Sequence, residues 1–229
     1  MCTISTDVIY LTWRKDIKKE RHIIGKLCRN NGRYSFSYIQ ENIKYLNENG
    51  VFLPYPAFPE LNEVYAENVL EIFGRRLLNP QRRDYEDFLT YWGANNYKND
   101  TFALLGLTGA KLLTDNFEFI APHTEIPASF NTDVSWLNTD SEYVVNEIRR
   151  LSNNEVEQKI KLVLDTNNEF DKKAVKVMFE NEKLGFLKSI HCENVHDAIV
   201  SGKTVKTRIA NIIKNGTIKE VLLRINIDN

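Results

Sequence analysis

The sequence has few cysteines and no long apolar run. Its 229 residues include three cysteines, Cys2, Cys28 and Cys192, an odd and scattered set that fits neither a disulfide framework nor a Cys-x-x-Cys site. No eighteen apolar residues occur together, so the sequence predicts no membrane-spanning helix. The first residues show no apolar segment behind a basic start. We therefore expect no signal peptide and a reduced, cytoplasmic protein.

The sequence also lacks an excess of charge and the common catalytic motifs. Lys and Arg number 30 and Asp and Glu number 31, a net charge of -1 that excludes both a generally cationic nucleic-acid coat and a strongly acidic tail. Walker, GxSxG and HExxH sequences are absent. Because 42% of residues are hydrophobic and 27% charged, the chain is typical of a folded protein. We expect a protein that is not an enzyme.

One hexapeptide is rich in metal-ligating side chains. It runs from His191 to His196, and Cys192 and His196 are four residues apart, so on a helix they could share one face. A stable zinc site needs three or four protein ligands, and no second pair lies nearby in the sequence. We interpret the segment as the start of an amphipathic helix and predict no metal and no cofactor.

The composition changes in the middle of the chain. Residues 122–145 contain two prolines and many Ser, Thr, Asn and Asp residues without sustained periodicity. This predicts two domains, residues 1–121 and 146–229, joined by a partly ordered linker in which Trp136 docks on one domain. The residues before Asn146 carry 15 basic and 19 acidic side chains (-4), and the rest carry 15 and 12 (+3). Any polyanion contact is therefore expected in the second half.

The first half predicts a small sheet with helices, an α+β domain. In chain order it shows strands at Val8–Trp13, His22–Leu27 and Tyr34–Tyr38, helices over 69–77 and from Asn79-Pro80 to Trp92, a helix capped by Asp100 and Gly109, and a strand at Asn116–Ala121. The basic pairs Arg75-Arg76 and Arg82-Arg83 lie beside acidic neighbours. We interpret both pairs as solvated helix faces and not as a track for phosphates.

The second half predicts mostly strands in the order βββαββ. The strands lie near residues 159–164, 174–179, 183–187, 205–213 and 218–227, with a helix that Gly202 ends. Asn215-Gly216 predicts a hairpin turn, since both residues accept positive φ. About ninety residues in this order predict a small, strongly curved sheet or barrel with one or two helices. The fold class of the whole chain is therefore expected to be α+β.

The loop Asp165 to Ala174 has an unusual composition for a hairpin connection. Asp165 and the asparagines that follow favour turns. Phe170 and the carboxylate of Asp171 come next, flanked by two lysines, a set that suits a ligand with a flat base, a hydroxyl and a phosphate. The alternative is a polar loop in which Phe170 fills the small barrel. The pattern alone leaves both interpretations open.

These residues resemble the core motif of the HIRAN domain. Asp165–Asn168, Phe170-Asp171 and Ala174–Val177 follow D-x-x-N-x-[YF]-D-x-x-A-[IV]-x-V, and Leu184–Lys188 resembles the G-[YH]-[LI]-x-[KR] strand without matching every position. The resemblance covers Asn146 to Asn229. It implies a modified OB-type barrel that binds DNA, with the 3′ end of a single strand as the ligand.

The resemblance also implies roles for individual residues. Asp171 would contact the terminal 3′-hydroxyl, Phe170 and Phe186 would be stacking platforms, Asn168 a polar contact and Lys188 a phosphate contact. Such a set agrees with physical expectation, because aromatic faces stack on any base and a few cations fix the backbone.

The chain departs from the family in its opening strand. Where the family often carries an aromatic, this sequence reads Ile148-Arg149-Arg150-Leu151. Arg149 and Arg150 keep the charge of a DNA contact and lack the stacking surface.

The first half resembles the N-terminal subdomain of HipA-type kinase toxins. The segments RHIIGKL, GRYSFSY, RDYEDFLTYWG and FALLGLTGAKLLTDNFEF carry this resemblance over residues 7 to 121. The kinase body is missing, so the resemblance implies a protein-interaction adaptor and no catalysis.

Three functions remain open at this point. We favour DNA binding coupled to a protein partner on the first domain. The alternatives are a toxin–antitoxin or defence accessory that binds a HipA-like kinase, and a module that brings a separately encoded DNA-processing enzyme to DNA.

Overall fold

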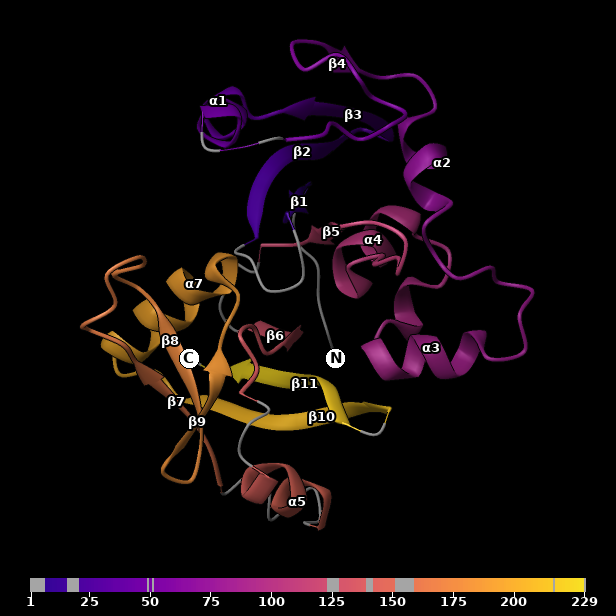
Figure 1. Ribbon diagram of the computed structural model, residues 1–229. Coiled ribbons are helices and arrows are strands. Elements are labelled where there is room, and N and C mark those ends of the chain that lie inside the picture. Colours follow the sequence, from indigo (N-terminus) through magenta and orange to yellow (C-terminus); the bar gives the residue numbers. More distant parts are fainter. Residues whose placement is uncertain are drawn as a thin grey trace. The chain divides into compact units, whose positions relative to one another are not determined.

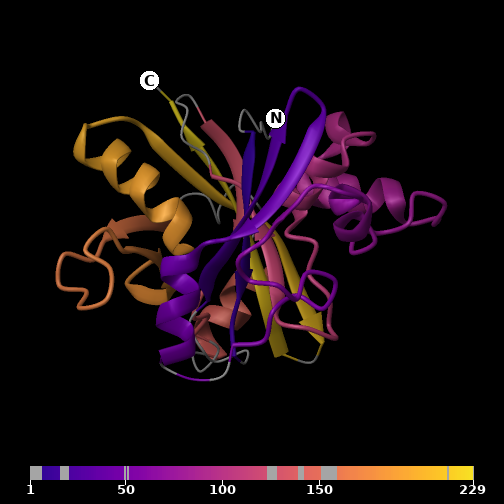
Figure 2. The same cartoon turned by 90° about the horizontal axis from the view of Figure 1, so that it is seen from above.

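The computed structural model describes residues 7–15, 21–48, 50, 52–122, 128–138, 142–150, 159–215 and 217–228. Proximity of Cα atoms divides the chain near Pro122 into two compact units, the first unit before it and the second unit after it. Both combine helices with antiparallel strands (Figures 1 and 2), which confirms the α+β class. Within the described residues, no helix is both long enough and apolar enough to cross a bilayer.

The first unit contains a five-stranded antiparallel sheet. Its order is β4-β3-β2-β1-β5, with β1 at Val8–Trp13, β2 at His22–Asn30, β3 at Arg33–Tyr38, β4 at Val64–Tyr65 and β5 at Phe117–Ile120. Asn31 and Gly32 both have positive φ and close the β2–β3 hairpin, as the primed turns of hairpins require. The four strands predicted in this half are confirmed, and β4 is an addition.

The described helices of the first unit lie between its strands in the chain, one between β3 and β4 and the others between β4 and β5. They are α1 (Gln40–Glu48), α2 (Val69–Gly74), α3 (Tyr85–Trp92), a short 3-10 helix (Asn95–Tyr97) and α4 (Thr101–Thr108). Asp100 accepts a hydrogen bond from the Ala103 N–H and Gly109 has φ of 74°, so both predicted caps of α4 are confirmed. Asn79 begins no helix: its side chain accepts from the Gln81 N–H, but residues 80–84 form turns and α3 begins only at Tyr85.

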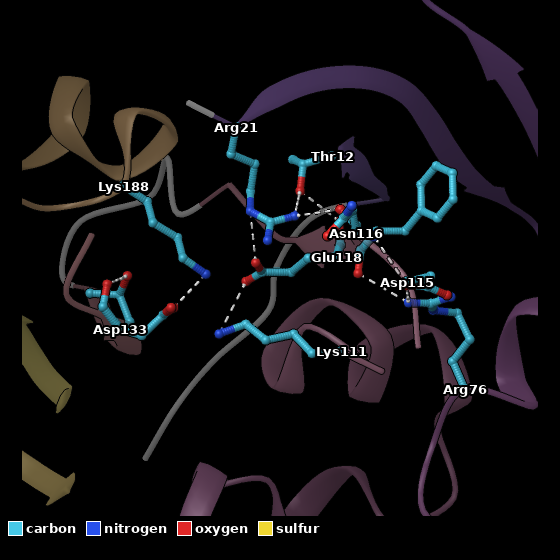
Figure 3. Close-up of polar contacts among 11 residues, drawn as sticks. Thr12, Arg21, Arg76, Lys111, Asp115, Asn116, Glu118, Asp133 and Lys188 are labelled. Atoms are coloured by element: carbon cyan, nitrogen blue, oxygen red, sulfur yellow. Dashed lines mark hydrogen bonds and ion pairs between the residues drawn. The ribbon is translucent and has the colours of Figure 1, made fainter. Parts of the chain in front are cut away.

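Arg76 was predicted to be solvated, and the structure shows that this is wrong. Its guanidinium binds both carboxylate oxygens of Asp115, at 2.6 and 2.9 Å, and donates to the carbonyls of Ala110 and Phe117 (Figure 3). The side chain is 2% exposed. Arg75 is exposed and pairs with Glu71, as expected for a helix face. The difference arises because Arg76 has distant partners that a local pattern does not contain.

The second unit contains two three-stranded sheets. One has the order β10-β11-β6 and the other β7-β8-β9, with β6 at Ala128–Asp133, β7 at Ile160–Leu164, β8 at Val175–Phe179, β9 at Glu182–Phe186, β10 at Val205–Asn215 and β11 at Thr217–Ile227. Helix α7 (Ser189–Val200) lies between β9 and β10 in the chain, followed by Gly202 at φ of 75°. The predicted order βββαββ is confirmed.

The two sheets of the second unit meet at their edges. Ser135, two residues beyond β6, exchanges two 2.8 Å backbone hydrogen bonds with Phe186 of β9, and β10 comes close to β7. Apolar side chains from both sheets and from α7 form one core, including Phe130, Val177 and Val195. The six strands therefore enclose a single apolar interior.

Two segments differ from the linker and opening strand expected from the sequence. Ala128–Asp133, inside the expected linker, is strand β6, because alternate residues are buried against β11. Trp136 is 58% exposed and is not docked by its ring. Arg149 and Arg150 end helix α5 (Glu142–Arg150), where buried Val144 and Ile148 follow helical spacing.

Candidate nucleic-acid interface

Asn168 organises the loop of residues 165–174 between β7 and β8. Its side-chain oxygen accepts hydrogen bonds from the backbone N–H groups of Phe170 and Asp171, both at 3.0 Å. Its own backbone N–H donates to the Asp165 carbonyl at 3.1 Å, and its side-chain amide to the Asp165 carboxylate at 3.3 Å. Since the side-chain oxygen already accepts twice, Asn168 fixes the course of the loop and positions its neighbours.

Phe170 points into solvent from this loop. Its side chain is 91% exposed, so the interpretation that it fills the barrel is wrong. Phe130, Val175 and Phe179 occupy the interior instead. A large aromatic held outward on a hydrogen-bonded loop offers a flat, exposed apolar face, which suits the stacking of a planar ligand.

Asp171 closes the turn with one carboxylate oxygen and leaves the other without a hydrogen bond to a described residue. Its Oδ1 accepts from the Lys173 N–H at 2.8 Å, and its backbone carbonyl accepts from the Ala174 N–H at 3.0 Å. The carboxylate therefore has a structural role in the turn. A carboxylate carries two acceptor oxygens, and Oδ2 of the half-buried Asp171 has no hydrogen bond to any other described residue.

Two lysines near the loop are paired with carboxylates. Lys173 Nζ lies 2.8 Å from Glu193 and 3.1 Å from Asp197, both on α7, and Lys176 Nζ lies 2.8 Å from Asp165. The hydrogen bonds to Glu193 and Asp197 raise the pKa of Lys173, and the bond from Lys176 lowers the pKa of Asp165. These contacts tie both sides of the loop to neighbouring elements.

Phe186 lies at the same end of the sheet as the loop. It pairs with Lys176 at the start of β8, and the next residue, Leu187, donates to the Val175 carbonyl at 3.0 Å. Its ring is half-buried, with Lys183 Nζ 5.0 Å from the ring centroid. The fold thus brings Asn168, Phe170, Asp171 and Phe186 to one end of the β7-β8-β9 sheet.

Lys188 reaches this end of the sheet without offering its charge to solvent. Its ammonium forms an ion pair with Asp133, and the two side chains are 12% and 15% exposed (Figure 3). The resemblance assigns a phosphate contact to Lys188, but the charge of this lysine is already paired with Asp133. The sequence did not indicate this ion pair, because Asp133 lies far from Lys188 along the chain.

The structure does not bring Arg150 to the loop. Arg150 is exposed at the end of α5, with its guanidinium 3.9 Å from Glu147 on the same helix. The side chain of Arg149 lies outside the described part of the chain. No described contact joins Arg150 to residues 165–174.

Trp136 is an exposed aromatic that the site prediction omitted. Its backbone has φ of 53°, an uncommon conformation for a bulky residue. The neighbouring Ser135 is hydrogen-bonded to Phe186, and Asn138 donates to the Leu184 carbonyl at 2.8 Å. The sequence shows a tryptophan among polar residues, but it does not show that the side chain of this tryptophan is exposed.

The candidate metal ligands of the hexapeptide from His191 to His196 contact other groups of the protein. Cys192 is buried and its thiol approaches the Leu187 carbonyl at 3.6 Å, whereas His196 contacts Asp197 at 2.9 Å. His191 is buried with its Nδ1 3.0 Å from the Thr132 hydroxyl. The described residues contain no group of three His, Cys, Asp or Glu side chains able to hold a metal.

The first unit has its own buried charge cluster. Glu118 on β5 is 2% exposed, with Arg21 at 3.1 Å and Lys111 at 3.9 Å (Figure 3). Arg21 also donates to the Thr12 hydroxyl and to the Asn116 carbonyl. Since the carboxylate and the arginine satisfy each other, this cluster stabilises the end of the sheet.

Comparisons with known proteins give one likeness. No protein-family model matches the chain, and a search of curated proteins found no match. Among solved structures, the HIRAN domain of human HLTF is similar at 17% identity, over 44% of this chain and 77% of that chain, with a TM-score of 0.32. At that TM-score the likeness supplies no argument, so any function of the second unit must be inferred from its own residues.

Proposed function

We propose that the second unit binds DNA, favours single strands with a free 3′-hydroxyl, and acts by binding and not by catalysis. The observation that carries the proposal is the 91% exposure of Phe170 on a loop fixed by Asn168. A stacked base contributes about 1–3 kcal/mol on such a platform. The sequence resemblance of residues 165–188 to the HIRAN motif supports the same ligand.

The other groups at this end of the sheet suit a strand terminus. Phe186 adds a second, partly covered ring with Lys183 beside it, so a base there meets both a π-face and a cation. The unused oxygen of Asp171 can accept a hydrogen bond from a hydroxyl. The same carboxylate repels a phosphate at close range, which favours a hydroxyl end over a phosphorylated end.

We further propose that the first unit binds protein and not DNA. Its arginines support this, since Arg75, Arg76 and Arg82 each have a carboxylate partner, namely Glu71, Asp115 and Asp84. Cations that are already paired add little to phosphate binding. A HipA-like kinase or a DNA-processing enzyme is the kind of partner that we propose for this unit.

The DNA-binding proposal is tested by fluorescence anisotropy of the full chain with a labelled single-stranded oligonucleotide. Phe170→Ala should weaken binding by about 1–3 kcal/mol, and Phe170→Tyr should restore it, because the ring face is the binding element. Leu113→Ala is the matched control, since Leu113 is a fully exposed apolar residue of the first unit. Equal affinities of wild type and Phe170→Ala would contradict the proposal.

A further inference from the structure

We propose that Lys172 makes the phosphate contact of the DNA-binding loop, in place of Lys188. This inference rests on the proposed function and names the cation that the function requires. A strand end needs a positive charge near its last phosphate to fix its register, since stacking alone leaves the base free to slide.

The other cations at this end of the sheet are engaged. Lys173 is held between Glu193 and Asp197, Lys176 is held by Asp165, and Lys188 is held by Asp133. Lys183 lies over the Phe186 ring. A lysine whose charge is balanced by a carboxylate must give up that partner to bind phosphate, which reduces its contribution.

Lys172 differs from these four residues. It is exposed, and the described part of the chain gives it neither an ion pair nor a ring contact. It directly follows Asp171. Asp171 accepts hydrogen bonds from the backbone N–H groups of Lys173 and Ala174, so residues before and after Lys172 are held together. The flexible Lys172 side chain therefore projects from a fixed backbone.

The order of side chains along the loop matches the order of groups at a strand end. A base stacked on Phe170 and a 3′-hydroxyl at Asp171 leave the phosphate of the terminal nucleotide one sugar away. Lys172, the residue after Asp171, carries the positive charge that a phosphate requires. Base, hydroxyl and phosphate are thus assigned to three consecutive residues.

Lys173 provides a matched control next to Lys172. Both residues are lysines on the same turn, yet Lys173 faces two carboxylates of α7. The proposal therefore gives the same substitution, Lys to Gln, different consequences at the two positions. Lys161, exposed near the opposite end of β7, controls for the loss of a surface charge in general.

The experiment measures affinity of the full chain for a 3′-hydroxyl single strand at several salt concentrations. Lys172→Gln should make the slope of log K against log salt less negative by about 0.7 and weaken binding about fivefold at 0.1 M salt, because one counterion fewer is released. Lys172→Arg should restore both values. Lys161→Gln and Lys173→Gln should keep the wild-type slope.

Two results would overturn the inference, and they are distinguishable. If wild type binds and Phe170→Ala weakens binding while Lys172→Gln keeps the wild-type slope, or if Lys183→Gln makes the slope less negative instead, the phosphate contact is elsewhere and DNA binding stands. If wild type shows no binding to single strands, the proposed function fails together with the inference.

Discussion

At the scale of single residues, exposure separates the side chains that build the units from those available to a ligand. Most phenylalanines of both units, such as Phe36, Phe73 and Phe179, are fully buried, whereas Phe170 is almost fully exposed. Arg76 shows the reverse case, because it is a charged residue whose side chain is buried in a hydrogen-bonded network. These two departures from the usual burial of residue types occur on the proposed binding loop and in a structural ion-pair network.

Arg76 should be important for the stability of the first unit. Arg76→Ala removes the guanidinium that binds Asp115 and two carbonyls, leaving their acceptors poorly satisfied, and we expect a loss of about 3–5 kcal/mol. Arg75→Ala removes only an exposed pair with Glu71 and should cost less than about 1 kcal/mol. Urea unfolding of both variants checks this. Equal losses would mean that the clamp contributes no more than a surface pair.

Cys192 should make the second unit less stable in alkali. Burial raises the pKa of its thiol from 9.0 to about 11, so the native state keeps a proton that the unfolded chain loses first. The stabilising contribution is complete below pH 9 and is lost as the pH rises from about 9 to about 11. Wild type should therefore lose more stability than Cys192→Ala between pH 8 and pH 10.5. Parallel losses in urea unfolding would contradict this.

At the scale of elements, the chain segment after β6 crosses β9 at very short range. A Cβ atom placed on Gly185 would lie 2.4 Å from the Val134 side chain and 2.5 Å from the Ser135 carbonyl oxygen. Ser135 in turn is hydrogen-bonded to Phe186. The lack of a side chain at Gly185 therefore allows the close approach of Ser135, whose hydrogen bonds hold Phe186, one of the two proposed stacking rings.

Gly185→Ala should disturb both stability and binding. The added methyl group meets backbone, which must move, at a cost of about 1–3 kcal/mol, and Phe186 should move with it. Gly202→Ala is the control. It has φ of 75° with open space around it, so it should cost about 1 kcal/mol and leave DNA affinity unchanged. Melting temperatures and anisotropy measured together check the pair. Unchanged affinity of Gly185→Ala would separate Phe186 from the site.

The predictability of these elements from sequence depended on the range of the interactions. Strands β7 to β11 and helix α7 follow from local alternation and caps. Strand β6 was missed, because its buried residues alternate with Ser, Asn and Asp that also favour turns. The motif indicated Phe170 and Asp171, while the pairing of Lys188 with Asp133 and the exposure of Trp136 depend on contacts distant in sequence.

At the scale of the whole molecule, the two units use their cations differently. Residues 1–122 carry 15 basic and 15 acidic side chains and residues 123–229 carry 15 and 16, so net charge does not distinguish the units. The first unit uses arginines such as Arg76 in internal ion pairs, and the second unit presents Lys172 beside an exposed aromatic. This division supports the proposal of a DNA-end reader joined to a protein-binding unit.

The preference of the full chain for strand ends tests this account most directly. We expect wild type to bind a 3′-hydroxyl oligonucleotide more tightly than the same oligonucleotide with a 3′-phosphate. Asp171→Asn keeps an acceptor for the Lys173 N–H and removes the charge, so it should shrink that ratio by tenfold or more, corresponding to about 1.5–3 kcal/mol. Glu169→Gln, an equal loss of charge two residues away on the same exposed loop, should keep the ratio. Equal binding of both ends by wild type, or an unchanged ratio in Asp171→Asn, would contradict the account.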